Sequence, residues 1–247
     1  MAEVERDYLT RIEMTEIKLI GIDADDTLWE SETFFAEVEE KFLELMSKYS
    51  SDTSLEKSLS SNEITNLRVF GYGVKSFTLS MIETAHVASG GDIASSDIKT
   101  IISWGKELLQ HPVVLLDGVE EAMKALTEDF AVFIVTKGDL LHQRSKIEES
   151  GLDKMVAGFE IFHEKDPESY LDFLSERNVD PQSFLMAGNS LRSDVLPVVA
   201  IGGHAVHIPY ELTWDYEKVE DSAVPKSRYT VIENILDLYD FVEKIHD

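Results

Sequence analysis

The chain has 247 residues, of which 43% are apolar, so it is long enough to fold as one large domain or as a core with an inserted module. Acidic residues outnumber basic residues by 48 to 22, and the net charge of −26 disfavours nucleic acid as a partner. No apolar run approaches the roughly 18 to 20 residues of a membrane span, so we expect no membrane partner and a cytoplasmic protein. Cysteine is absent, which excludes disulfides and thiolate metal sites.

The chain begins with a charged segment and a single strand. Residues 1–16 are mostly charged and are expected to form a short extension of the core. The apolar run 17–22 predicts a buried strand, which ends in the acidic residues Asp23, Asp25 and Asp26. Carboxylates a few Å apart repel one another and raise each other's pKa, so we expect a cation or a proton among them.

Residues 31–112 show apolar residues at helical spacing only. Asn62 is a candidate cap for a short helix, Val74 to Ala88 forms the clearest amphipathic pattern, and Ser96 is a candidate cap for the next helix. We therefore predict an all-helical domain at 31–112, inserted into a core made of residues 1–30 and 113–247.

After Gly118 the pattern changes to helices that alternate with short β-rich runs, at residues 131–135, 156–162, 183–187, 204–208 and 229–232. Alternating strands and helices predict an α/β fold, here a three-layer Rossmann-like core with a parallel sheet and right-handed crossovers. Ligands of such sheets bind beyond the carboxyl ends of the strands, so the polar residues that follow each strand are the candidate site.

Each of these polar residues also has an ordinary structural explanation. Thr136 could be a turn residue, Lys165 a surface lysine and Asp194 an acid at a helix N-terminus. Taken together, they supply oxygen ligands for Mg²⁺, hydrogen-bond donors for a phosphate group and a positive charge beside a nucleophile. This combination indicates phosphoryl transfer.

Four motifs follow one another in a characteristic order: Asp23-x-Asp25-x-Thr27, then Thr136, then Lys165, then Gly188-Asn189-x-x-x-x-Asp194. This order resembles that of the haloacid dehalogenase superfamily of hydrolases, over essentially the whole chain. The helical segment 31–112 matches the superfamily's C1-type cap domain in position and character.

The resemblance implies a role for each motif residue. Asp23 is expected to attack phosphorus and form an aspartyl-phosphate, while Asp25 protonates the leaving group and then activates water. Thr136 and the backbone amide of Lys137 are expected to hold the phosphate oxygens. Lys165 is expected to pair with Asp23 and with the phosphate.

The resemblance also implies a Mg²⁺ site formed by Asp23, the backbone carbonyl of Asp25, Asn189 and Asp194. Asn189 stands where an acidic residue is usual, and its amide oxygen is a neutral ligand that weakens the metal site. Asp194 is then the favoured carboxylate ligand, either directly or through water.

Dehalogenases of this fold lack the second aspartate of the first motif, so Asp25 favours a phosphatase. We expect a Mg²⁺-dependent phosphomonoester hydrolase of a small phosphorylated metabolite, active as a monomer or homodimer. A phosphomutase of the same fold and a non-enzymatic phosphate- or metal-binding protein remain alternatives. Lys75, in the segment Gly71–Phe77, is a candidate contact for the substrate anion, although this segment also reads as the start of a helix.

Overall fold

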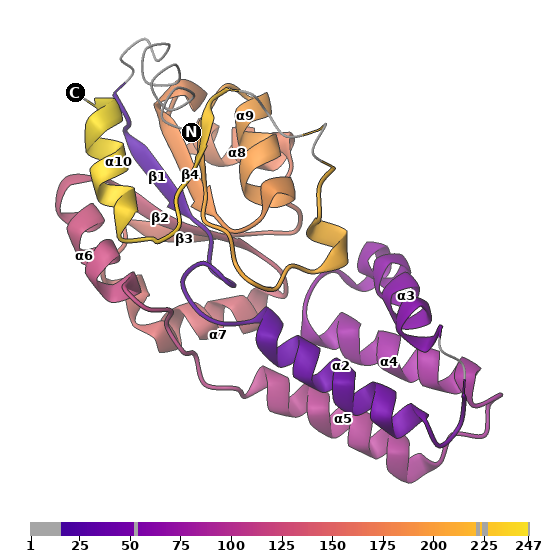
Figure 1. Cartoon of the computed structure of the whole chain (residues 1–247). Helices are drawn as coiled ribbons and strands as arrows, with labels where there is room; N and C mark the ends of the chain where they lie inside the picture. Colours follow the sequence, from indigo (N-terminus) through magenta and orange to yellow (C-terminus); the bar gives the residue numbers. More distant parts are fainter. Residues whose placement is uncertain (1–15, 52–53, 221–222, 224–226, 247) are drawn as a thin grey trace. The chain divides into compact units, whose positions relative to one another are not determined.

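The computed structural model describes residues 16–51, 54–220, 223 and 227–246 (Figure 1). The extension expected at residues 1–16 therefore lies, apart from Glu16, outside the described residues. Six parallel strands form one sheet in the order β3-β2-β1-β4-β5-β6. The strands are β1 (Leu19–Ile22), β2 (Val132–Lys137), β3 (Gly158–Phe162), β4 (Phe184–Gly188), β5 (His204–His207) and β6 (Tyr229–Val231).

Helices cover both faces of this sheet, which confirms the predicted three-layer α/β core. The core helices are α6 (Val119–Asp129), α7 (Leu140–Ser150), α8 (Pro167–Glu176), α9 (Leu196–Ala200) and α10 (Asp237–His246). Side chains alternate along a strand, so Ile20 and Ile22 of β1 pack on the face covered by α6 and α10, whereas Leu19 packs on the face covered by α8 and α9.

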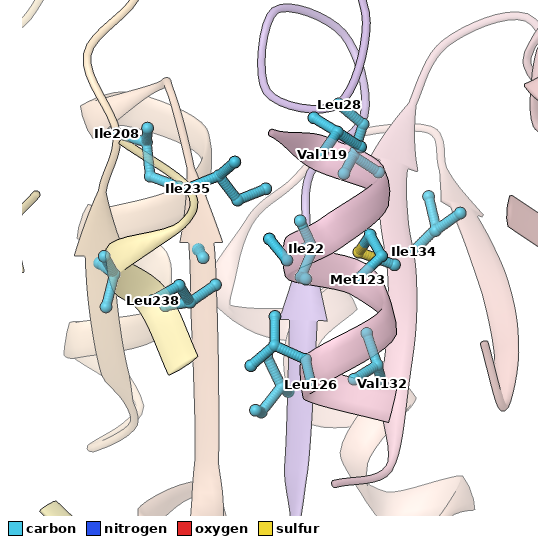
Figure 2. Packing of buried hydrophobic residues seen from close by; sticks show 14 of the residues in the cluster. Ile22, Leu28, Val119, Met123, Leu126, Val132, Ile134, Ile208, Ile235 and Leu238 are labelled. Carbon is cyan, nitrogen blue, oxygen red and sulfur yellow. The ribbon is translucent and has the colours of Figure 1, made fainter. Parts of the chain in front are cut away.

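Figure 2 shows the first of these faces. Val119, Met123 and Leu126 of α6 recur at helical spacing and lie against the apolar side chains of β1 and β2, among them Ile22 and Ile134. All five side chains are fully buried. This packing fixes β1 and β2 side by side, so their carboxyl ends carry the residues that follow them to one edge of the sheet.

The chain divides into two compact units. The second unit contains Ser31–Pro112 together with the short segment Gly138–His142. Its helices are α2 (Glu32–Met46), α3 (Leu55–Phe70), α4 (Val74–Ala88) and α5 (Ser95–Leu109), which share an apolar core of their own. A Cβ atom on Gly105 would lie 2.2 Å from Thr78 Oγ1, so glycine permits the close approach of α5 to α4.

Two predicted caps are wrong. Helix α3 begins at Leu55, and Asn62 lies inside it, where its amide donates to Thr84 Oγ1 at 2.8 Å instead of capping a helix. Helix α5 begins at Ser95, and the residue before it is Ala94, so Ser96 is not the cap. None of the helices in the described part of the chain combines the length and the apolar character needed to cross a membrane.

The helical segment that follows β4 is not a single regular helix. A π-helical turn (Leu191–Val195) precedes α9 (Leu196–Ala200), because Ser190 Oγ accepts a hydrogen bond from the backbone N–H of Ser193 at 3.0 Å and starts the turn earlier. Pro197 lies in the first turn of α9, where its missing N–H costs no hydrogen bond.

Candidate active site

The polar residues at the carboxyl ends of β1, β2 and β4 lie at one edge of the sheet, because these three strands are neighbours. Asp23 directly follows β1, Thr136 is near the end of β2, and Asn189 directly follows β4. Lys165, from the segment between β3 and α8, reaches the same place, since its ammonium contacts Asp23. The structure thus brings together residues from all four motifs.

Lys165 lies between two carboxylates. Its Nζ atom donates to Asp23 Oδ1 and to Asp194 Oδ1, the latter at 2.6 Å, and its side chain is almost completely buried. The second oxygen of Asp194 accepts the backbone N–H of Ser190 at 2.9 Å. A Cβ atom on Gly188 would lie 2.2 Å from Asp194 Oδ2, so only glycine permits this approach.

Burial and neighbouring charges have opposite effects on the pKa values of Asp23 and Lys165. Burial raises the pKa of Asp23 above its ordinary value, and Lys165 only partly opposes this. Burial acts to lower the pKa of Lys165, but Asp194 and Asp23 outweigh it and raise that pKa. The raised pKa favours the charged form of Lys165, and a further cation near Asp23 would favour the ionised form of that aspartate.

Asp25 belongs to a separate set of contacts. Its Oδ1 atom accepts from Lys146 Nζ at 2.5 Å and from Trp29 Nε1 at 2.6 Å, and its Oδ2 atom accepts from Gln143 Nε2 at 2.9 Å. Burial acts to raise the pKa of Asp25, but Lys146, Trp29 and Gln143 together lower it. The carboxylate faces donors from three side chains, which favour its ionised form.

Gln143 also links Asp25 to the second motif. Its Nε2 atom lies 2.8 Å from Thr136 Oγ1 and 3.1 Å from the carbonyl oxygen of Lys137. Thr136 is buried, so this contact orients its hydroxyl at the end of β2. Sequence reasoning missed Gln143 and Lys146; the only signal was their three-residue spacing on the helix that follows the second motif.

Thr27 connects the first and fourth motifs. Its Oγ1 atom accepts the backbone N–H of Asn189 at 3.0 Å, and it lies 3.4 Å both from Asp23 Oδ2 and from Asn189 Oδ1. One carboxylate oxygen and one amide oxygen therefore face the same hydroxyl group. Asp26, which the sequence places in this turn, adopts a left-handed backbone conformation with φ of 61°.

Lys137 and the unpredicted Glu217 form a further ion pair, at 2.5 Å. Glu217 lies in a short 3₁₀ turn (Asp215–Glu217) after β5 and also accepts hydrogen bonds from Ser190 and Ser193. No periodicity or motif marks this residue in the sequence, so sequence reasoning did not find it.

Lys75 lies in the helical unit, at the start of α4. Its ammonium pairs with Asp139 at 2.7 Å, and Asp139 Oδ1 also accepts the backbone N–H of His142 at 3.0 Å. Asp139 belongs to the same compact unit as Lys75. The predicted contact of Lys75 with a substrate anion stays a prediction.

Comparison with known proteins identifies the family. The model of the haloacid dehalogenase-like hydrolases matches residues 17–202, about three quarters of the chain. The chain belongs to this hydrolase family. No curated protein sequence matches it significantly.

Several solved structures resemble this haloacid dehalogenase-like hydrolase. A haloacid dehalogenase-like family hydrolase from Xanthomonas campestris is 39% identical, with 94% of this chain and 96% of that chain covered and a TM-score of 0.83. A predicted phosphoglycolate phosphatase from Haemophilus somnus 129PT is 18% identical, with coverage of 92% and 99% and a TM-score of 0.64. A 2-haloacid dehalogenase from Pseudomonas syringae pv. tomato DC3000 is 17% identical, with coverage of 92% and 99% and a TM-score of 0.60. The last two likenesses show the fold alone.

The site of this hydrolase carries an excess of negative charge. Four carboxylates pair with three ammonium groups, in the sets Asp23–Lys165–Asp194, Asp25–Lys146 and Glu217–Lys137. Glu164, 3.8 Å from Lys137, adds a further carboxylate at the rim. An anionic substrate is repelled by this balance unless an additional cation binds with it.

Proposed function

We propose that this hydrolase is a Mg²⁺-dependent phosphomonoester phosphatase with a C1-type helical cap, which acts on a small phosphorylated metabolite through an aspartyl-phosphate. The observation that carries this proposal is that Asp23 and Asp25, two residues apart in the chain, contact different sets of side chains. Asp23 is buried against Lys165, whereas Asp25 is held by its own donors, Lys146, Trp29 and Gln143. One carboxylate can then act as nucleophile while the other handles protons.

The first half-reaction forms a bond between an oxygen of Asp23 and phosphorus and breaks the bond from phosphorus to the leaving-group oxygen, which takes a proton from Asp25. Lys165 offsets negative charge around Asp23, while Thr136 and the amide of Lys137 hold phosphate oxygens. In the second half-reaction water attacks phosphorus, Asp25 takes its proton, and Asp23 is released. The donors around Asp25 support this second role more directly than donation of a proton to the leaving group.

The donor set near Thr27 fits Mg²⁺. Asp23 Oδ2 and Asn189 Oδ1 both lie 3.4 Å from Thr27 Oγ1, and oxygen ligands from few side chains are what Mg²⁺ uses. When bound, Mg²⁺ would neutralise charge on the phosphate and Asp23. In the described residues, no three Asp, Glu or His side chains are grouped for metal binding, so the backbone carbonyl of Asp25 and water would complete the site.

Asp194 was also expected to bind the metal. Both of its oxygens are occupied, one by Lys165 Nζ and one by the N–H of Ser190. We therefore assign Asn189 as the second side-chain ligand and assign Asp194 to the positioning of Lys165. This division follows the contacts and leaves the metal with one carboxylate and one neutral amide.

The test compares wild type with Asp23→Asn on p-nitrophenyl phosphate and acetyl phosphate, with and without Mg²⁺. We expect phosphate release that requires Mg²⁺ and falls by at least about 1,000-fold in Asp23→Asn, since the nucleophile is removed. Asp172→Asn, an exposed residue on α8, is the matched control and should retain activity.

Wild-type activity that persists in Asp23→Asn would refute the aspartyl-phosphate route. A parallel assay with 2-chloropropionate measures chloride release. Chloride release without phosphate release would instead indicate a dehalogenase, and transfer of phosphate between positions of one sugar phosphate would indicate a phosphomutase.

A further inference from the structure

Glu217 accepts hydrogen bonds from three side chains that come from two other segments of the chain. Its Oε1 atom accepts from Lys137 Nζ at 2.5 Å, and its Oε2 atom accepts from Ser190 Oγ at 2.5 Å and Ser193 Oγ at 2.7 Å. Lys137 Nζ also donates to Ser193 Oγ at 2.8 Å, which closes the network. The side chains of Lys137 and Glu217 are only 15% and 12% exposed, so water competes weakly with these contacts.

This network joins three parts of the core domain. Lys137 ends β2, Ser190 and Ser193 belong to the turn after β4, and Glu217 belongs to the segment after β5. These segments meet at the carboxyl edge of the sheet, where Thr136 and Asp23 also lie. The family motifs include the first two segments but not the third, so Glu217 brings a new segment to the site.

A second contact fixes the same turn. The guanidinium group of Arg192 lies 4.1 Å from the ring centre of Tyr216, and its Nη1 atom donates to the carbonyl oxygen of Tyr216 at 3.3 Å. Within the turn, the N–H of Glu217 donates to the carbonyl oxygen of Trp214 at 2.9 Å. Trp214–Glu217 is thus held at both its side chains and its backbone.

The hydrogen bonds of Glu217 restrict the direction of the Lys137 side chain, and this affects how Lys137 can contact a phosphate group. Its ammonium is shared between Glu217 and Ser193, so the long side chain is held in one direction. If the carboxylate is removed, the ammonium loses its strongest partner and the end of β2 loses an anchor. The backbone N–H of Lys137 lies in that end of the strand.

We propose that Glu217 is a positioning residue, which holds Lys137 and the turn Trp214–Glu217 in place so that the second motif binds the substrate phosphate. This inference rests on the proposed phosphatase function and adds a residue outside the four motifs. Glu217 acts through Lys137 and does not touch the reacting atoms. Its removal should therefore weaken phosphate binding more than it slows the chemical step.

The experiment measures KM and kcat for p-nitrophenyl phosphate, and the inhibition constant of inorganic phosphate, in wild type and in Glu217→Ala and Glu217→Gln. We expect KM and the inhibition constant to rise about tenfold in Glu217→Ala, with kcat changed less than about threefold. Glu217→Gln keeps an acceptor for the serines and should show a smaller rise. Glu220→Gln, an exposed neighbour in the same segment, is the matched control and should behave as wild type.

A double variant with Lys137→Met separates positioning from general destabilisation. If Glu217 acts through Lys137, adding Glu217→Ala to Lys137→Met should raise KM little further. An unchanged KM in Glu217→Ala, a loss confined to kcat or to the active fraction, or additive effects in the double variant would overturn the inference. Wild type that hydrolyses no phosphoester would overturn the proposed function itself, so the two failures are distinguishable.

Discussion

His204 gives a quantitative prediction for the stability of the fold at acid pH. It is the first residue of β5, its side chain is buried, and neither ring nitrogen has a partner of normal hydrogen-bond geometry among the described residues. Burial, followed by the nearby charge of Arg228, lowers the pKa of His204 from 6.5 to about 4, and a backbone contact with Gln182 opposes this only weakly. The folded protein therefore favours the neutral ring.

The sign of the effect follows from linkage. The unfolded chain binds a proton at His204 below pH 6.5, whereas the folded chain binds it only near pH 4, so stability is complete above pH 6.5 and is lost as the pH falls. The interval between these values corresponds to about 3 kcal/mol, of which about 2 kcal/mol is lost at pH 5. For a chain of this size that is a fall of about 4 to 8 °C in Tm.

The assay is thermal unfolding of wild type, His204→Leu and His86→Gln at pH 7.5 and pH 5. We expect His204→Leu to lose about 2 kcal/mol less than wild type between these pH values, because leucine fills the site without a titratable group. His86 is exposed on α4 and serves as the control. His207, whose pKa is also lowered, contributes to every variant and cancels in the comparison. Equal pH dependence in wild type and His204→Leu would refute the reasoning.

Two further predictions concern the site. Lys146→Met removes the cation paired with Asp25, so kcat for phosphate release should fall at least about tenfold at nearly constant KM. Lys146→Arg should recover part of this kcat, and an unchanged kcat in Lys146→Met would mean that Lys146 does not act through Asp25. Lys75→Ala should lower the free energy of unfolding by less than about 1 kcal/mol, because the ion pair of Lys75 with Asp139 is exposed. The same variant should raise KM if Lys75 binds the substrate, and an unchanged KM would leave Lys75 as a partner of Asp139 alone.

The motif residues could be predicted because their signals are local. A buried strand that ends in Asp23 and Asp25 is unusual in itself, and parallel strands place their carboxyl ends at one edge. The order of strands β2, β1 and β4 then brings Thr136 and Asn189 to the same edge as Asp23. Alternation of helices and strands was enough to predict this much of the core.

The side chains that complete the site could not be predicted in this way. Lys146, Gln143 and Glu217 are residue types that ordinarily occupy solvated helix faces and turns, so their identity carries little information. Their contacts with Asp25 and Lys137 join residues that are from 80 to 121 positions apart in the chain. Only the packing of α7 and of the segment after β5 brings these groups to the strand ends.

The predicted helix caps were wrong for a related reason. Asn62 has the side chain of a good cap, but several serines precede it, and the helix begins before it at Leu55. Inside α3, the side-chain amide of Asn62 donates a hydrogen bond to Thr84 of α4, and the amide of Asn66 similarly donates to Ser80 at 3.1 Å. Polar pairs between two helices satisfy the same donors that a cap would use, and a local pattern does not distinguish the two cases.

The proposed division of roles, with Asn189 as a metal ligand and Asp194 as the partner of Lys165, required the structure, because both residues stand in one motif and both have side-chain oxygen atoms. Lys165 approaches from the segment after β3 and binds Asp194, so that carboxylate balances the lysine and leaves Asp23 only a share of its charge. Asn189, one residue beyond β4, contacts Thr27, whose hydroxyl also lies 3.4 Å from the other oxygen of Asp23. A second carboxylate at this position would add a further negative charge to a site that already has an excess, and the neutral amide avoids this repulsion of the proposed phosphate substrate.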